Sequence, residues 1–172
     1  RLTDLHRLPQ YRTLSKIKNH LKDIYRYFTR NDVLDLVLND ENLEYEMPDI
    51  LEAPYHNDEE NETKVWHKEI DFDFGGGLKV EGFAAIRETG STSNAGFSLF
   101  RRGRVIEGSG EQKYRPKLIF GNTNSFKYQR VFGELHLSGF DVSHTKGGFQ
   151  WDENEQAFLE LLREKLDSEP LP

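Results

Sequence analysis

The sequence predicts an α+β fold, with a mainly antiparallel sheet covered by helices. Short segments of alternating apolar and polar residues, typical of half-buried strands, follow one another between residues 65 and 138, separated by glycine-containing turns. Amphipathic helical patterns lie before and after this region, over residues 14–28 and 153–168. Strands joined by short turns, with helices on one face, make an α+β sandwich.

The first helix is predicted by apolar residues that recur at three- and four-residue steps over residues 14–28. Thr13 or Ser15 can cap its start, and Asn31 suits its end. Two interpretations remain open. The helix either packs on its own domain or connects to a further domain and packs partly on it.

A hairpin is predicted next, from alternation over residues 33–38 and 43–47 around a four-residue loop, 39–42. The segment 56–62 that follows is strongly acidic. It lacks the fixed spacing and central glycine of a calcium loop, so we expect a solvated loop without a bound ion.

Two longer strands, 65–74 and 78–87, are predicted on either side of Gly75-Gly76-Gly77. Triple glycine can suggest a phosphate-binding loop, but no Gly-Lys-Ser/Thr follows and no helix starts there. Strands over 97–100 and 105–106, joined at Arg102-Gly103, and a fifth strand from Val131 complete the sheet. We expect short helical turns and loops between residues 108 and 129.

The final helix has a predicted capping box formed by Asp152 and Glu155. Its buried stripe contains Phe158, Leu159, Leu162 and Leu166, and it ends near Ser168.

Composition limits the classes of site and location. There is no cysteine, which excludes disulfides and thiolate metal sites, and the six histidines show no metal-ligand spacing, so no metal site is expected. No apolar run approaches membrane-spanning length and no signal peptide opens the chain, so a cytoplasmic location without a membrane partner is expected. Because the chain opens on Arg1, we expect a fragment of a larger protein.

Charge is segregated along the chain, although the net charge is −7. Residues 5–30 are basic, 32–73 acidic and 101–130 basic again. The last basic segment can contact nucleic acid or the acidic surface of a partner domain, and the lack of an evident aromatic stacking platform favours the partner domain. Its candidate contact residues are Arg101, Arg102, Arg104, Lys113, Arg115, Lys117, Lys127 and Arg130.

The stretch SHTKGGFQW, residues 143–151, places Lys146 between a strand end and the pair Gly147-Gly148. Glycines let the backbone turn sharply, so the lysine can be extended toward a partner with little steric hindrance. From the residues alone, an ordinary surface lysine remains the alternative.

From about Leu14 onward the chain resembles the second, "transducer" domain of GHKL-type ATPases. These are the gyrase, heat-shock chaperone, histidine-kinase and MutL relatives, and the similarity is greatest to bacterial proteins of the MORC-like branch. The resemblance lies in AGFSLFRRGRVIEGSG from Ala95, YRPKLIFGNTNSFKYQRVFGELHL from Tyr114, and SHTKGGFQW. It implies a connecting helix over residues 1–31 and, over 32–172, a transducer domain built like a domain of a small-subunit ribosomal protein.

The resemblance also implies a site. Lys146 matches the lysine that the family's transducer supplies to the ATP γ-phosphate, and His144 and Thr145 match the same nucleotide-binding loop. ATP and Mg²⁺ are bound mainly by the family's first domain, whose asparagine, glutamate base and glycine-rich lid are not found in this sequence. The fragment alone is therefore expected to be inactive, with its own upstream ATP-binding domain as partner; a homodimer stays open. The alternative is a non-catalytic module that binds protein or nucleic acid.

Overall fold

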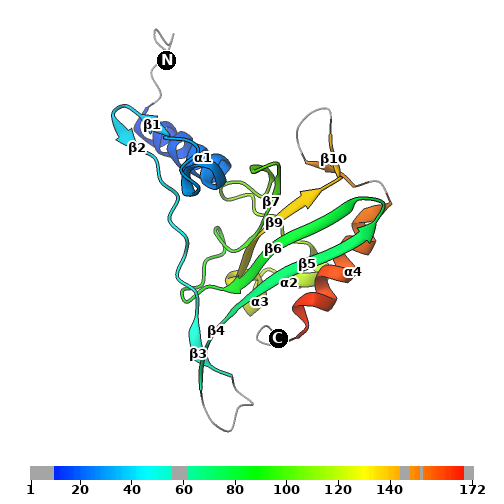
Figure 1. The fold of residues 1–172 in the computed structure, drawn as a ribbon. Coiled ribbons are helices and arrows are strands. Elements are labelled where there is room, and N and C mark those ends of the chain that lie inside the picture. The colour runs from blue at the N-terminus through cyan, green and yellow to red at the C-terminus, as the bar shows by residue number, and fades with distance from the viewer. Residues whose placement is uncertain (1–9, 56–61, 144–147, 152, 169–172) are drawn as a thin grey trace. The chain divides into compact units, whose positions relative to one another are not determined.

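The computed structural model describes residues 10–55, 62–143, 148–151 and 153–168. The chain divides into two units, Arg1–Tyr45 and Glu46–Pro172. Each unit is built around its own secondary structure (Figure 1).

The first unit contains α1 (Tyr11–Arg30). Its N-cap is Gln10, which makes no side-chain capping hydrogen bond, so the predicted cap at Thr13 or Ser15 is wrong and both residues lie inside the helix. The predicted end is confirmed, because Asn31 is the C-cap and its Nδ2 donates to the Tyr27 carbonyl at 2.6 Å.

A small hairpin completes this unit, with β1 (Val37–Leu38) antiparallel to β2 (Glu41–Asn42). A hairpin lies here as predicted, but its turn has two residues instead of four. The second strand, β2, falls within the predicted loop 39–42, and the predicted strand over 43–47 is wrong. Asn39 and Asp40 adopt φ of 53° and 61°. Asn and Asp tolerate this left-handed region, so the chain reverses in the tighter turn.

The second unit is organised by a five-stranded sheet in the order β5-β6-β9-β7-β8. Its strands are β5 (His67–Gly75), β6 (Leu78–Ile86), β7 (Gly96–Arg101), β8 (Arg104–Glu107) and β9 (Val131–Ser138). The predicted α+β class with a mainly antiparallel sheet is confirmed.

The strand order departs from a succession of hairpins, because β9 lies between β6 and β7 and runs parallel to β7. The two short helices α2 (Lys117–Phe120) and α3 (Phe126–Arg130), expected as helical turns, occupy the β8–β9 connection. They return the chain to the end of the sheet where β7 begins, and β9 therefore enters in the same direction as β7.

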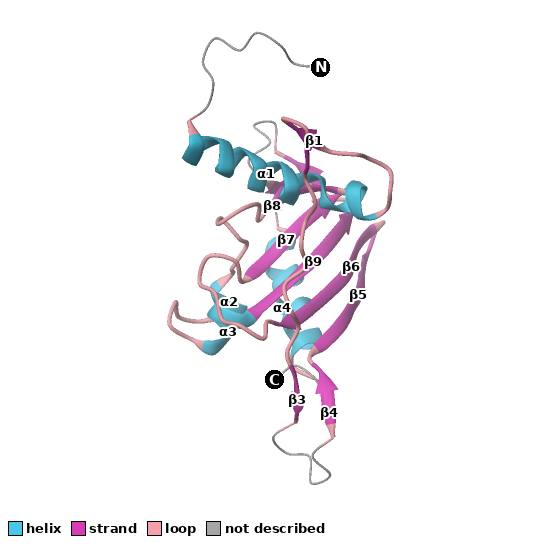
Figure 2. Cartoon of the chain, turned by 90° about the vertical axis from the view of Figure 1, so that its left-hand side faces the viewer, coloured by secondary structure: helices cyan, strands magenta, loops and turns pink. Residues whose placement is uncertain are grey.

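The core lies between the sheet and α4 (Asn154–Leu166), which runs along one sheet face (Figures 1 and 2). Phe158, Leu162 and Leu166 of α4 are buried there against apolar side chains of the strands, as predicted, whereas Leu159 of the predicted stripe is only partly buried. Asp152, the expected cap, lies outside the described residues. The N-cap position is Glu153, whose side chain makes no capping bond.

Two further strand pairs extend this unit and were not predicted. β3 (Glu52–Pro54) pairs with β4 (Thr63–Val65), and β10 (Asp141–Val142) pairs with β11 (Phe149–Gln150). Of the predicted acidic loop, residues 56–61 lie outside the described residues.

Candidate functional site

The predicted site segment is carried by the β10–β11 hairpin. Asp141 pairs with Gln150 and Val142 with Phe149, and the Ser143 N–H donates to the Gly148 carbonyl at 3.0 Å. His144, Thr145 and Lys146 lie outside the described residues, so their roles stay predictions. The described residues before and after 144–147 thus belong to a hydrogen-bonded pair of strands.

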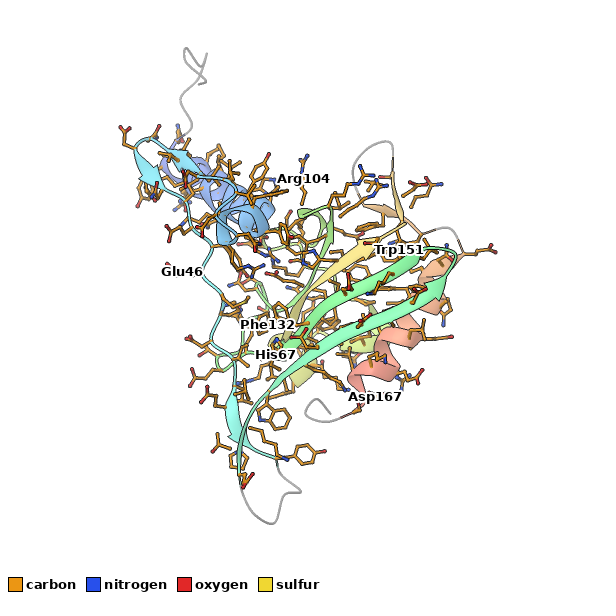
Figure 3. All side chains as sticks on the ribbon, viewed as in Figure 1. Glu46, His67, Arg104, Phe132, Trp151 and Asp167 are labelled. Atoms are coloured by element: carbon orange, nitrogen blue, oxygen red, sulfur yellow. The ribbon has the colours of Figure 1, made fainter. Side chains whose placement is uncertain are left out.

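An aromatic cluster holds the hairpin to the end of the sheet. The ring of Phe149 lies 5.6 Å from that of Trp151, and the Trp151 ring lies 4.7 Å from Phe158 of α4. Phe140 packs edge-on to Phe149 at 6.4 Å. Figure 3 places Trp151 at this end of the molecule and Asp167 at the far end of α4. Burying rings of this size stabilises by about 2 kcal/mol each, so the hairpin has a packed base.

Charged groups of the β7–β8 hairpin contact both strands of the β10–β11 hairpin. The Arg101 guanidinium lies 3.3 Å from the Asp141 carboxylate on β10. The Phe149 N–H on β11 donates to Oε2 of Glu107 at 3.4 Å. Each strand of the site hairpin is thus tied by one side chain to the neighbouring edge of the sheet.

Two half-buried groups near the hairpin, Glu107 and Tyr114, have raised pKa values. Burial raises the pKa of the Glu107 carboxyl; the Phe149 N–H opposes this, and the nearby Glu155 carboxylate adds to it. Burial also raises the pKa of the Tyr114 phenol, with Glu155 and Glu107 acting in the same direction. The Tyr114 hydroxyl therefore stays protonated and donates to Glu155 at 3.4 Å.

The predicted basic cluster is not one surface. Arg102 and Arg104 are exposed at the β7–β8 turn, and Arg101 lies beside them. The parallel register of β7 and β9 places this turn at the same end of the sheet as the β10–β11 hairpin. Lys117, exposed at the start of α2, lies at the opposite end.

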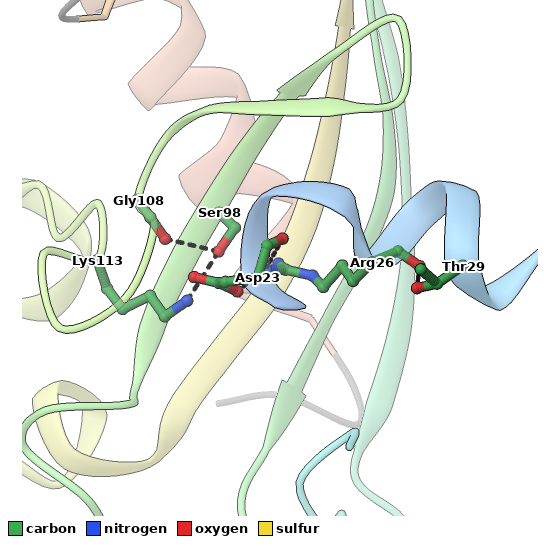
Figure 4. A network of polar contacts seen from close by, with 6 residues as sticks. All are labelled: Asp23, Arg26, Thr29, Ser98, Gly108 and Lys113. Atoms are coloured by element: carbon green, nitrogen blue, oxygen red, sulfur yellow. Dashed lines mark hydrogen bonds and ion pairs between the residues drawn. The ribbon is translucent and has the colours of Figure 1, made fainter. Parts of the chain in front are cut away.

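Lys113 and Arg115 are engaged within the second unit. The Lys113 ammonium donates to the Ser98 hydroxyl at 3.2 Å, and that hydroxyl donates to the Gly108 carbonyl at 2.8 Å (Figure 4). Arg115 donates to the carbonyls of Ala95 at 2.7 Å and Ser93 at 3.0 Å. These two cations therefore hold the chain around β7.

Arg130 likewise makes contacts within the second unit. Its guanidinium donates to the Arg87 carbonyl at 3.1 Å and to that of Glu88, and it lies 5.2 Å from the Phe126 ring centroid. Lys127 is exposed on α3. The arginines of the basic segment thus divide into internal tethers and the exposed β7–β8 turn.

A row of rings crosses three strands on the sheet face turned away from α4. His67 stacks on Phe83 at 5.1 Å, and Phe83 packs edge-on to Phe132 at 6.0 Å. The sequence did not indicate this row, because its members come from β5, β6 and β9. Glu69 and Asp71 lie on the same face of β5, and carboxylates beside a ring platform disfavour a polyanion.

A small apolar hollow of about 90 Å³ lies among α2, α3 and the end of α4, at the opposite end of the sheet from the hairpin. Leu118, Phe126 and Leu166 line it together with Lys127 and Arg163. Among the described residues there is no group of three His, Asp or Glu side chains that could hold a metal ion. None of the helices in the described ranges is long and apolar enough to cross a membrane.

Sequence reasoning missed Glu107, Tyr114 and Trp151 as parts of the site's support. Glu107 is one carboxylate among many in the sequence, and only its contact with Phe149, 42 residues away, distinguishes it. Trp151 was within the SHTKGGFQW motif, so its position beside the site could have been proposed from the sequence. No protein-family model matches this chain, and no curated protein is significantly similar to it.

Proposed function

We propose that residues 32–172 are the transducer domain of a GHKL-type ATPase, built like the corresponding domain of a small-subunit ribosomal protein. In this proposal Lys146 reaches the γ-phosphate of ATP that is bound, with Mg²⁺, by a separate ATP-binding domain of the same protein. The observation that carries the proposal is the anchored hairpin. The sequence resemblance assigns residues 144–146 to nucleotide contact. The strands on either side, β10 and β11, pair with each other, and Glu107 and Arg101 of the β7–β8 hairpin contact them.

The chemistry of this role needs one positive charge placed against the phosphoryl group as it separates. A lysine ammonium is a compact charge suited to that task, and a site carried on a supported element is held more closely than one on a free loop. His144 and Thr145 would help to orient the nucleotide. Domain docking would then be required for turnover, because lysine and nucleotide come from different domains.

The test is Lys146→Ala in a protein that joins this chain to its ATP-binding domain. We expect turnover to fall by about a hundred- to a thousandfold, the usual loss when a preorganised charge is removed. Nucleotide affinity should fall much less, since the remaining contacts belong to the other domain. Lys165→Ala, an exposed lysine in the last turn of α4, is the matched control. Turnover within about twofold of the parent would make Lys146 an ordinary surface lysine.

A second candidate function, a non-catalytic interaction module, is favoured by the β7–β8 turn. Arg102 adopts φ of 51° at an exposed position, where glycine or asparagine would be less strained. Strained backbone conformations cluster at functional sites, so the strain at exposed Arg102 favours a role in binding a partner. A partner with an acidic surface would suit Arg101, Arg102 and Arg104 together.

Nucleic acid is the other partner that this turn could contact. Such binding would weaken steeply as salt rises, because it releases counterions from the phosphate backbone. A gel-shift titration at low salt, with Arg102→Glu/Arg104→Glu as comparison, decides this. Absence of retardation for the parent chain excludes nucleic acid as the partner of the turn.

A further inference from the structure

Glu107 stands out among the described carboxylates because it contacts the strand that ends the site segment. Its Oε2 accepts the Phe149 N–H at 3.4 Å, and its own backbone closes β8. We infer that Glu107 is a positioning residue, whose carboxylate fixes β11, and with it the base of the segment 144–147, against the β7–β8 hairpin. The consequence for turnover rests on the proposed role of Lys146, whereas the tether itself does not.

The neighbouring glycine supports this assignment. A Cβ added at Gly148 would lie 3.1 Å from Glu107 Oε2, which is tighter than an ordinary contact. A glycine at 148 therefore leaves room for the carboxylate to approach the strand. Gly148 also supplies the carbonyl that accepts the Ser143 N–H at 3.0 Å, so the carboxylate lies at the bond that closes the segment.

The Phe149 N–H donates to Glu107, whereas its other neighbours are an acid and a phenol. Glu155 on α4 is an acid, and the Tyr114 hydroxyl donates to Glu155. Burial and Glu155 raise the pKa of Glu107, so the carboxylate is held in place against an electrostatic cost. A charged acceptor makes a stronger bond to an N–H than a neutral one does. The hold on β11 should therefore weaken as pH falls through the pKa of Glu107.

Arg101 provides the second point of attachment. It pairs with Asp141 at 3.3 Å on the opposite strand of the hairpin. Asp141 is exposed, so this pair contributes little stability by itself, and its effect is on orientation. Each strand of the hairpin is thus contacted by one side chain of the β7–β8 hairpin.

The first experiment uses this chain and does not involve nucleotide. Amide hydrogen exchange is measured by NMR for the parent, Glu107→Ala and Glu107→Gln, with exposed Glu111→Ala as control. We expect exchange of the Phe149 amide to accelerate about five- to tenfold in Glu107→Ala, the loss of one hydrogen bond to a charged acceptor, and about twofold or less in Glu107→Gln, whose amide oxygen still accepts. The Phe149 amide shift should titrate in the parent and not in Glu107→Gln. Unchanged exchange at Phe149 in Glu107→Ala would overturn the inference.

The second experiment measures turnover in the protein that includes the ATP-binding domain. Glu107→Ala should lower kcat about tenfold with nucleotide affinity unchanged, because the lysine is misplaced while the nucleotide pocket is intact, and Glu107→Gln should restore most of it. If Lys146→Ala abolishes turnover but Glu107→Ala leaves it unchanged, the positioning role is wrong. If Lys146→Ala itself has no effect, the proposed function fails, and the exchange measurement alone decides whether Glu107 fixes β11.

Discussion

At the scale of single residues, Glu107 is where burial and charge conflict. Its pKa is raised in the folded protein, chiefly by burial. A carboxyl whose folded-state pKa lies above its unfolded value stabilises the fold most at low pH, and that contribution is lost as pH rises through the folded pKa. The charged form that accepts the Phe149 N–H is thus the form that burial disfavours.

Glu107→Gln should therefore stabilise the protein at pH 7 relative to the parent, because the neutral amide keeps an acceptor and removes the charge. The advantage should shrink as pH falls toward about 4, where the parent carboxyl is protonated in both states. Urea unfolding of both proteins at pH 4, 5.5 and 7 measures the difference. An advantage that grows toward low pH would contradict the raised pKa.

Gly133 illustrates a second residue-scale constraint, the close approach of backbones in the centre of the sheet. A Cβ at Gly133 would lie 2.2 Å from the Phe83 carbonyl oxygen and 3.0 Å from the Phe97 ring. Neither neighbour can move without disturbing β6 or the core.

Gly133→Ala should therefore lower the free energy of unfolding by at least about 2 kcal/mol, the upper range of overpacking costs. Thermal and urea unfolding measure the change. Gly76→Asn is the control: Gly76 has φ of 63° with open space around it, and asparagine tolerates that conformation. Equal losses for the two variants would show that steric crowding at Gly133 is relieved in the protein.

At the scale of elements, the β7–β8 hairpin combines a local and a tertiary role. Its turn residues Arg102 and Gly103 have φ of 51° and 77°, the pattern of a tight two-residue hairpin turn. Its flanking residues Arg101 and Glu107 reach the β10–β11 hairpin. The conformation of the turn therefore fixes how β7 and β8 align. This alignment places Arg101 beside Asp141 and Glu107 beside Phe149.

Arg102→Asn should raise the free energy of unfolding by about 0.5–1 kcal/mol, because asparagine adopts this conformation with less strain. Arg104→Asn, one residue past the turn at the start of β8, should give no such gain. Urea unfolding of both variants is the measurement. A loss of stability in Arg102→Asn would mean that the arginine side chain contributes more than its backbone strain costs.

At the scale of the whole molecule, the described residues form two units with their own secondary structure, and the candidate site belongs to the second. The sequence contains no glycine-rich phosphate loop of the Gly-Lys-Ser/Thr type. The proposed lysine would supply only one contact to a nucleotide.

The chain alone should therefore bind Mg-ATP weakly or not at all, with a dissociation constant of about 1 mM or weaker, which corresponds to roughly 4 kcal/mol of binding free energy. Isothermal titration calorimetry with Mg-ATP measures this. Stoichiometric micromolar binding would show that the chain contains a nucleotide site of its own and would contradict the division of roles proposed above.

The sequence by itself determined the elements whose signals are local. The hairpins at Gly75–Gly77 and Arg102-Gly103, the end of α1 at Asn31 and the apolar stripe of α4 follow from backbone preferences and periodicity within a few residues. The sequence also singled out the segment 143–151 as a candidate site, and its role stays a prediction. Helix starts were less well determined, since Gln10 and Glu153 occupy N-cap positions without side-chain capping bonds.

Only the tertiary structure decided which distant residues meet. The position of β9 between β6 and β7 rests on pairings between strands far apart in the chain, which no short window of sequence contains. That insertion places the end of β9, and hence the β10–β11 hairpin, beside the β7–β8 turn, while Arg115 and Arg130 are drawn to the other end as tethers. Charge and spacing along the chain could nominate these side chains, but their partners are fixed by strand order, because contacts between strands far apart in sequence depend on the packing of the whole sheet.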